Sequence, residues 1–294
     1  RSSLRVLRYG LPVDDYSKGA GLPGTPTRVW AIRQALDDKH HSLIVVSFLD
    51  ATLILSVGDE IREYKDSGFS LSRQTLEIVT LAGVAGHAQI HSDGILMVLP
   101  GKQKREWPAP AGKRIVCASA NERQIIVALE GGTIVYFELD DGDQTMNEAG
   151  RCEVGSEVSC IDIGAIPHGR QRSLFAAVGS VDNYVRILSL APDRLLEDLG
   201  LQALQQTPHS VRQVEMTGVG VGGGAHGVGA SAKLYLCIGL RNGIMVRTQL
   251  DWISGKMSRL RTRFVGVGNV GLFRAKVARQ VGCSCMRKPD VALL

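Results

Sequence analysis

The sequence is poor in the features that mark a membrane or secreted protein. Only 5% of its 294 residues are aromatic, and no apolar run reaches the ~18 residues that a membrane-spanning helix needs. No Asn-x-Ser/Thr acceptor for N-glycosylation occurs, which removes one sign of a secreted protein and favours a reducing compartment inside the cell. We therefore expect a globular protein that enters no membrane.

Motifs for catalysis and phosphate binding are also missing. The sequence contains no Gly-x-Ser-x-Gly elbow, no His-Glu-x-x-His and no Gly-Lys-Ser/Thr, so hydrolase, zinc-protease and P-loop chemistry lack their usual signatures. His87 and His91 are four residues apart, but on a strand this spacing separates them by about 13 Å. We expect no metal site, no cofactor and no enzymatic activity.

The cysteines do not follow the C-x-x-C spacing that zinc sites use. Three of them, at 117, 160 and 237, lie within apolar strand patterns and are predicted to be small buried side chains. Cys283 and Cys285 form the one close pair, and their alternation would place both thiols on one face of a strand. The other cysteine is Cys152. We expect no redox or metal function from this set.

What the sequence does contain is a repeated hairpin. Five times a β-prone apolar run breaks at a tight turn and resumes as a second run. The copies are Val45–Val57, Gln89–Leu99, Ile125–Leu139, Ala177–Leu190 and Cys237–Leu250. Their turn centres lie 43, 38, 51 and 60 residues apart. Recurrence at roughly 40 to 50 residues predicts the blades of an all-β propeller.

The turns of these hairpins carry the residues that tight turns need. Asp, Asn and Gly tolerate the positive φ of a two-residue hairpin turn. The expected turn residues are Asp50, Asp93, Gly94, Gly131, Gly132, Asp182, Asn183, Asn242 and Gly243. We interpret them as structural residues, because Asp and Asn in such turns commonly bond their own backbone.

Further short apolar stretches precede the hairpins. They are Leu76–Thr80, Arg114–Ser119, Val158–Ile163 and Val211–Met216. Each predicts one more strand, which gives the three or four strands that a blade requires. Arg194–Gln206 has some helical periodicity, but Gly200 lies within it and disfavours a helix by about 1 kcal/mol relative to Ala. We expect a loop and a strand there.

One low-complexity segment, Gly218–Gly229, formally matches the G-x-G-x-x-G pattern of dinucleotide sites. That pattern binds pyrophosphate only where a helix follows the glycines. Here Ala232–Ile238 follows and has the pattern of a strand. We therefore expect a flexible loop inserted between two strands of a blade.

Basic residues crowd the last 55 residues of a chain whose formal net charge is only +5. The candidates for a contact surface are Arg259, Arg261 and Arg263, and the basic region continues from Arg274 to Lys288. Such a surface could meet phosphate or an acidic protein. It could equally be a solvated sheet edge that resists aggregation. Phe264 and Phe273 are the nearby aromatic residues, and both fit a strand pattern as core side chains.

Eight segments of the sequence are similar to a known family. They are Ser2–Leu11, Leu22–Trp30, Val46–Ser56, Asp66–Phe69, Ala128–Glu138, Gln171–Leu190, Ile238–Asp251 and Arg261–Phe273. The family they resemble is that of splicing factor 3B subunit 3, the splicing branch of a larger family that includes the large subunits of the cleavage and polyadenylation specificity factor and of the damaged-DNA-binding protein. The amino-acid sequences of Gln171–Leu190 and of Ile238–Arg263 resemble the splicing branch specifically.

The resemblance implies three seven-bladed propellers and a small helical portion, of which this chain would be most of the second propeller. Residues 1–28 would be an inter-propeller strand and loop, and residues 29–294 would be the blades. It also implies a nuclear, non-catalytic scaffold of the splicing factor 3B complex that supports branch-site recognition. The implied partners are the other subunits of that complex, notably a helical-repeat subunit and small subunits, with RNA contacted indirectly. The alternative is a propeller that binds nucleic acid directly through its C-terminal basic region.

The resemblance thins after Phe273. Val281–Leu294 keeps an Arg, a Pro and a Val where a sixth hairpin would lie, but its sequence is otherwise a poor match to the family. We therefore expect about five to six blades of the seven, an incomplete ring, and a chain that is a fragment of a longer protein.

Overall fold

The computed structural model describes residues 22–34, 38–58, 60–84, 86–140, 142, 145–217, 232–277, 280–286 and 291–293. The regular structure in these ranges is all β-strand apart from two short 3-10 helices, η1 (Pro100–Lys102) and η2 (Pro192–Arg194). The expectations for Leu4–Leu11 and Gly218–Gly229 fall outside the described residues.

The strands form six antiparallel sheets in which sequence neighbours pair, and we call these sheets blades 1 to 6. Blade 1 contains β1 (Arg28–Ile32), β2 (Leu43–Ser47), β3 (Thr52–Val57) and β4 (Ile61–Glu63); blade 2 contains β5 (Thr75–Leu81), β6 (Gly86–His91), β7 (Gly94–Val98) and β8 (Lys104–Pro108). Blade 3 contains β9 (Ile115–Ala120), β10 (Gln124–Leu129), β11 (Thr133–Leu139) and β12 (Met146–Glu153).

The second half of the chain repeats this plan. Blade 4 contains β13 (Val158–Ile163), β14 (Phe175–Ser180), β15 (Tyr184–Ser189) and β16 (Asp198–Ala203); blade 5 contains β17 (Pro208–Thr217), β18 (Ala232–Leu240), β19 (Ile244–Leu250) and β20 (Met257–Phe264). Blade 6 is three-stranded, with β21 (Gly271–Val277), β22 (Gln280–Met286) and β23 (Val291–Leu293).

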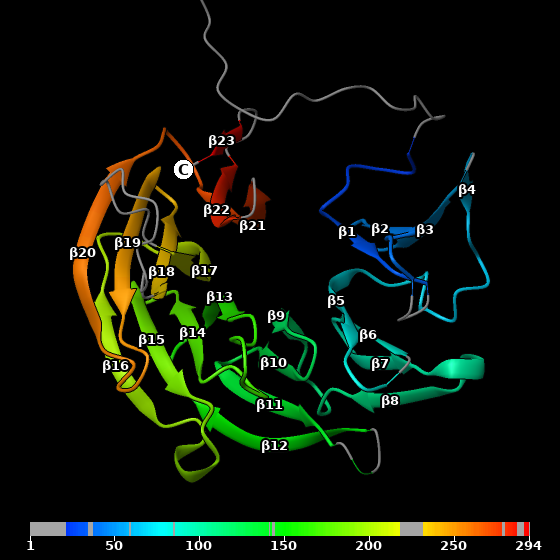
Figure 1. The fold of residues 1–294 in the computed structure, drawn as a ribbon, viewed down its shortest axis with the longest axis horizontal. Coiled ribbons are helices and arrows are strands. Elements are labelled where there is room, and N and C mark those ends of the chain that lie inside the picture. Colours follow the sequence, from blue (N-terminus) through cyan, green and yellow to red (C-terminus); the bar gives the residue numbers. More distant parts are fainter. Residues whose placement is uncertain are drawn as a thin grey trace, which may run out of the picture.

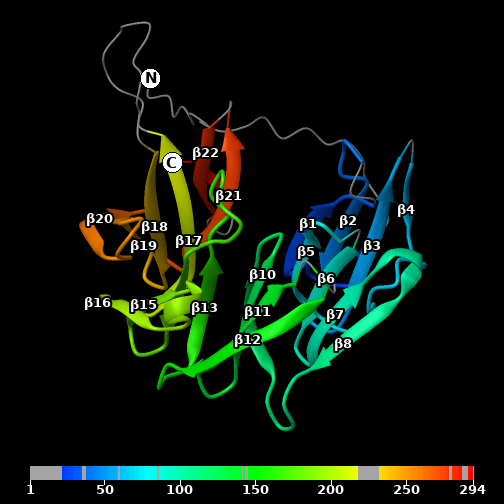
Figure 2. The same cartoon turned by 60° about the horizontal axis from the view of Figure 1, so that its bottom comes forward.

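The blades follow one another around an arc (Figure 1). The first strand of each blade lies toward the centre, and the last strand lies toward the outside. Figure 2 shows the same order from another side, with β16 and β20 at one margin and β4 and β8 at the other. This arrangement confirms the expected β-propeller architecture, and the arc is not closed into a ring.

The five repeated hairpins are the second and third strands of blades 1 to 5, as the sequence predicts. The four apolar stretches expected to precede hairpins are β5, β9, β13 and β17. Arg194–Gln206 is also as expected, because it contains the end of η2, a connection and β16. In the predicted sixth hairpin, β22 pairs with β23 in antiparallel order.

The hydrophobic core lies between neighbouring blades, and a blade within the arc, such as blade 3, packs against neighbours on both faces. In β10, Ile125 and Val127 pack with blade 2, while the alternating Ile126 and Ala128 pack with blade 4. All four side chains are fully buried. Burying an Ile or Val side chain contributes about 1.5–3 kcal/mol, so the repeated apolar runs hold the blades together face to face.

Candidate functional site

In blades 1 to 3, four of the five expected turn residues lie in the connections between the second and third strands, and Gly94 lies in a strand. Asp50 is exposed between β2 and β3, and Asp93 is exposed between β6 and β7. Gly94 is the first residue of β7. Gly131 and Gly132 connect β10 to β11, and both have φ of +84°, a conformation that favours glycine.

The turns of blades 4 and 5 follow the same plan. Asp182 and Asn183 connect β14 to β15, and Asn183 has φ of +67°. Asn242 and Gly243 connect β18 to β19, and Gly243 has φ of +82°. A Cβ atom at Gly243 would collide with the carbonyl oxygen of Gly266, so this turn requires glycine for two separate reasons.

Arg259, Arg261 and Arg263 lie on β20, the outer strand of blade 5. All three side chains are exposed, and no described residue forms an ion pair with them. The register between β19 and β20 shifts between Arg247 and Gln249, and Arg259 has φ of +54° at that irregularity. Figure 1 shows β20 at the outer margin of the arc, and the three arginines belong to this strand.

The expectation that Phe264 and Phe273 are core residues is wrong. Phe264 is 68% exposed at the end of β20, and Phe273 is 46% exposed on β21. The alternation of apolar and polar residues along a strand does not distinguish these exposed positions from core positions. The outer strand β20 is exposed along nearly its whole length, because it has a neighbouring strand on one side only.

Arg274 does not join the outer basic surface. Its Nη2 atom lies 2.5 Å from Oδ2 of Asp162 and donates to the carbonyl oxygen of Ile163 at 3.0 Å. Its Nε atom donates to the carbonyl oxygen of Gln213 at 3.1 Å. Arg274 on β21 thus links the inner strands of blades 4, 5 and 6.

Asp162 is the centre of this link, and only 1% of it is exposed. Besides Arg274, it accepts a hydrogen bond from the backbone N–H of Gln213 at 2.7 Å and pairs with Nη1 of Arg212 at 3.3 Å. Sequence reasoning did not single out Asp162. The available signal was a carboxylate within the apolar strand Val158–Ile163, since such a residue is rarely buried without a partner.

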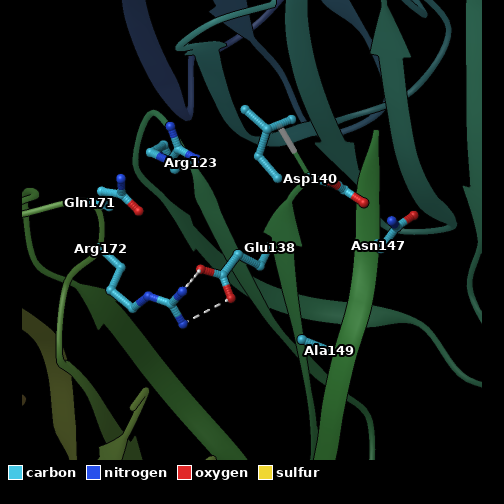
Figure 3. Close-up of a pocket in the computed structure, with 8 residues that line it drawn as sticks. Arg123, Glu138, Asp140, Asn147, Ala149, Gln171 and Arg172 are labelled. Atoms are coloured by element: carbon cyan, nitrogen blue, oxygen red, sulfur yellow. Dashed lines mark hydrogen bonds and ion pairs between the residues drawn. The ribbon is translucent and has the colours of Figure 1, made fainter. Parts of the chain in front are cut away.

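A second polar site is an open groove between blades 3 and 4 (Figure 3), with a volume of about 360 Å³. Glu138 of β11 and Arg172 of the β13–β14 connection face each other in it, with an Nη2–Oε1 distance of 3.1 Å. The lining residues are Arg123, Glu138, Leu139, Asp140, Asn147, Ala149, Gln171 and Arg172. They include no Ser, Thr, Cys or His, so the groove offers hydrogen bonds and charges but no hydroxyl, thiol or imidazole nucleophile.

Burial keeps three of the described cysteines, Cys117, Cys152 and Cys160, in the unreactive thiol form. Burial raises the pKa of Cys160 to about 12 and that of Cys152 to about 11, and it also raises the pKa of Cys117. Thiolates are the reactive form of cysteine, so these thiols stay protonated at neutral pH. Cys160 and Cys237 are buried as expected, whereas Cys117 is only partly buried against the core between blades 3 and 4. The side chains of Cys283 and Cys285 fall outside the described residues.

His87 and His91 lie at opposite ends of β6 and have different neighbours. His91 is fully buried, and its Nε2 atom lies 3.2 Å from Nη1 of Arg73. His87 contacts the hydroxyl of Thr80 at 3.1 Å. Burial lowers the pKa of both imidazoles. Among the described residues, no group of three or more His, Cys, Asp or Glu could hold a metal ion.

None of the described helices is long and apolar enough to cross a membrane.

Comparison with known proteins identifies close relatives of this chain. The sequence matches the family described as the RSE1/DDB1/CPSF1 second beta-propeller over residues 18–286. It is 42% identical over 280 residues to splicing factor 3B subunit 3 of Danio rerio, which covers 95% of this chain and 23% of that protein. It is 41% identical over 280 residues to pre-mRNA-splicing factor rse1 of Emericella nidulans (95% of this chain, 22% of that protein).

A plant relative has similar coverage. Spliceosome-associated protein 130 A of Arabidopsis thaliana is 39% identical over 286 residues, with 97% of this chain and 23% of that protein covered. The chain thus spans about a quarter of the length of the curated relatives that it matches.

One solved structure supports the fold. The crystal structure of BBS1N in complex with ARL6DN, soaked with lead, superimposes with a TM-score of 0.60 over 91% of this chain and 76% of that one. The two sequences are only 14% identical, so this similarity concerns the architecture alone.

Proposed function

The chain belongs to the RSE1/DDB1/CPSF1 second beta-propeller family, and on this premise we propose that it is a non-catalytic scaffold module in pre-mRNA splicing. Its relatives at 39–42% identity are named as splicing factors or spliceosome-associated proteins. This sequence similarity, extending over at least 95% of the chain, is the observation that carries the proposal.

The surface of the propeller supports a scaffold. The groove between blades 3 and 4 is lined mainly by charged and amide side chains and has no hydroxyl, thiol or imidazole, while burial keeps Cys117, Cys152 and Cys160 protonated. A catalytic site needs a nucleophile, a base and an orienting group in one place. Polar grooves and exposed strand edges are instead what a protein partner can bind.

The proposed partners are other subunits of the splicing factor 3B complex, notably a helical-repeat subunit and small subunits, in the nucleus. The proposed role is to support branch-site recognition through protein–protein contacts, with RNA contacted indirectly. No cofactor is part of this proposal.

The test is co-precipitation from nuclear extract with the tagged full chain, with and without nuclease treatment. If the scaffold proposal is right, splicing factor 3B subunits remain bound after nuclease, because protein surfaces hold them. Loss of these subunits on nuclease treatment would contradict it. A chain of the same length from an unrelated propeller is the matched control for non-specific capture.

A second candidate function is direct binding of nucleic acid, and exposed Phe264 beside Arg263 favours it. Unpaired bases stack on exposed aromatic rings, and phosphates pair with arginine. Direct binding to duplex DNA predicts a steep loss of affinity with salt, about 0.9 log units per log unit of salt for each phosphate contacted. A fluorescence-anisotropy titration with labelled RNA and duplex DNA at several salt concentrations measures this slope.

A further inference from the structure

The outer edge of blade 5 combines unpaired backbone groups with a basic face and an apolar face. From this combination we infer that β20 binds an extended acidic peptide, which adds to blade 5 as a fifth strand. The inference rests on the proposed scaffold function. It places one contact of the scaffold at β20 and states the chemistry of the partner that binds there.

The backbone of β20 is available for strand addition. Among the described strands, β20 is the last of its sheet and pairs with β19 alone. The N–H of Val265 donates to the carbonyl oxygen of Gly243 at 2.9 Å. In an antiparallel pair every second residue bonds to the partner strand, so this bond shows which residues of β20 bond to β19. By that alternation, Arg261 and Arg263 bond to β19, while Leu260, Thr262 and Phe264 direct their N–H and C=O groups outward.

The two faces of this edge differ in chemistry. Arg261 lies opposite Arg247, and Arg263 lies opposite Met245, so their side chains share one face. Thr262 and Phe264 lie opposite Val246 and Ile244 on the other face.

Leu260 precedes Thr262 by two residues and shares the second face. Leu260 is 46% exposed, and Phe264 is exposed still further. One face of the edge is therefore basic and the other is apolar.

Arg247 adds to the basic face. Its guanidinium lies over the ring of Tyr235, 5.2 Å from the ring centre, and it is in register with Arg261. No described carboxylate pairs with Arg247, Arg261 or Arg263. Three cationic groups in this arrangement favour a partner with carboxylates on alternate residues.

The outer strands of blades 1 to 4 lack this combination. The strand β4 has only three residues, and β8 ends in Pro108. In β12, Arg151 pairs with Glu148 of the same strand, and β16 contains no Lys or Arg. Short strands, prolines and internally balanced charge are ordinary protection against edge-to-edge pairing. The edge from Leu260 to Phe264 carries uncompensated charge of one sign, which repels a second basic edge but attracts an acidic one.

The outward backbone groups favour a peptide over nucleic acid. Leu260, Thr262 and Phe264 present N–H donors and C=O acceptors in alternation, which an extended peptide complements at both kinds of group. A phosphate oxygen can only accept hydrogen bonds and is repelled by the outward carbonyls. The fitting partner alternates acidic residues, which face the arginines, with apolar residues, which face Leu260 and Phe264.

The test uses the tagged full chain and a fluorescein-labelled nine-residue peptide that alternates Glu with Val and Thr. The key variant is Thr262→Pro, which removes an outward N–H but none that bonds to β19, a position where an edge strand tolerates proline. Thr262→Val is the matched control, because it keeps the N–H. We expect Thr262→Pro to weaken peptide binding about tenfold and Thr262→Val to leave it unchanged.

Two further probes keep the inference testable if Thr262→Pro does not fold. N-methylation of alternate amides of the peptide blocks the same hydrogen bonds without changing the protein, and we expect it to abolish binding. The double variant Arg261→Glu and Arg263→Glu should lose the acidic peptide and bind a peptide in which Lys replaces Glu. The inference is overturned if the N-methylated peptide binds as well as the parent, or if the charge reversal leaves the peptide preference unchanged.

The outcomes separate this inference from its alternatives. Binding of labelled RNA that is lost in the charge-reversal variant but kept in Thr262→Pro would assign the edge to phosphate and overturn strand addition. Failure of the peptide to bind, with splicing factor 3B subunits still recovered from nuclease-treated extract, would reject the edge and keep the scaffold. Loss of those subunits from the unmodified chain would reject the scaffold itself.

Discussion

The arginines at the centre of the arc and those at its outer margin have opposite surroundings. On the inner strands, Arg212 and Arg274 converge on the buried carboxylate of Asp162. On the outer strand β20, Arg259, Arg261 and Arg263 face solvent, and no described carboxylate pairs with them. The inner arginines hold blades together, whereas the outer ones are available to a partner.

The difference follows from position within a blade. The inner strand β13 has blades 3 and 5 on the two sides of its sheet, so a charged group there loses water and needs a partner. An outer strand has one neighbouring strand and keeps its water. The same side chain therefore stabilises the fold at one place and can bind a ligand at the other.

The largest effect in this comparison is expected at the inner carboxylate. Replacing Asp162 with Ala leaves two arginines and the N–H of Gln213 without their shared acceptor, so we expect a loss of about 3 kcal/mol in the free energy of unfolding. Urea denaturation measures it. Asp162→Asn is the matched control and should lose less, because the amide oxygen still accepts hydrogen bonds. A change below about 0.5 kcal/mol in Asp162→Ala would contradict the assigned role.

A smaller loss is expected when the inner arginine is removed instead. Arg274→Met keeps the aliphatic stem but removes donors to Asp162, Ile163 and Gln213. The side chain is partly exposed, and Asp162 keeps Arg212, so we expect about 1–2 kcal/mol. The free energies of Asp162→Ala, Arg274→Met and the double variant form a cycle. Strict additivity in that cycle would show that the two residues do not act as a pair.

A buried imidazole should instead produce pH dependence: His91 is fully buried, and its nearest carboxylate oxygen, Oε1 of the half-exposed Glu106, lies 3.8 Å from Nε2. Burial, and then Arg73, lower the pKa of His91 below its usual value near 6.5. The unfolded chain then takes up a proton first, so His91 contributes stability above pH 6.5 that is lost as the pH falls toward the lower pKa of the folded state. His91→Asn should therefore flatten the acid side of the stability curve. Parallel curves for the two proteins would contradict this.

The smallest change in stability is expected at the outer arginines. Arg261→Glu and Arg263→Glu together should alter the free energy of unfolding by no more than about 0.5 kcal/mol, because both side chains are exposed and no described carboxylate pairs with them. Thermal melts at matched ionic strength measure the effect. A loss comparable to that of Arg274→Met would mean that β20 contributes to the fold in the way the inner strands do, and it would remove the distinction between the two regions.

The sequence predicted most of the blade plan because hairpins are local. Each hairpin needs two short apolar runs and a tight turn, and in blades 3 to 5 turn residues such as Gly131 and Asn183 have positive φ. The β-branched content and the repeated spacing predicted the propeller, and the family resemblance implied the same fold.

The same reasoning failed where contact partners come from distant blades. Asp162 and Arg274 are separated by 112 positions, so no local pattern joins them. Phe264 was expected in the core because it fits an alternating strand pattern, and it is exposed because β20 is an edge.

By itself, the sequence determined the all-β class, the hairpin repeat, the turn positions and the family, because each depends on residues that are close together along the chain or on similarity over its length. Only the tertiary structure decided which strand of each blade lies inside and which lies outside. The position of a strand within its blade sets how far a charged side chain is solvated. The arginines that pair with Asp162 are therefore partly shielded from water, whereas those on β20 face solvent.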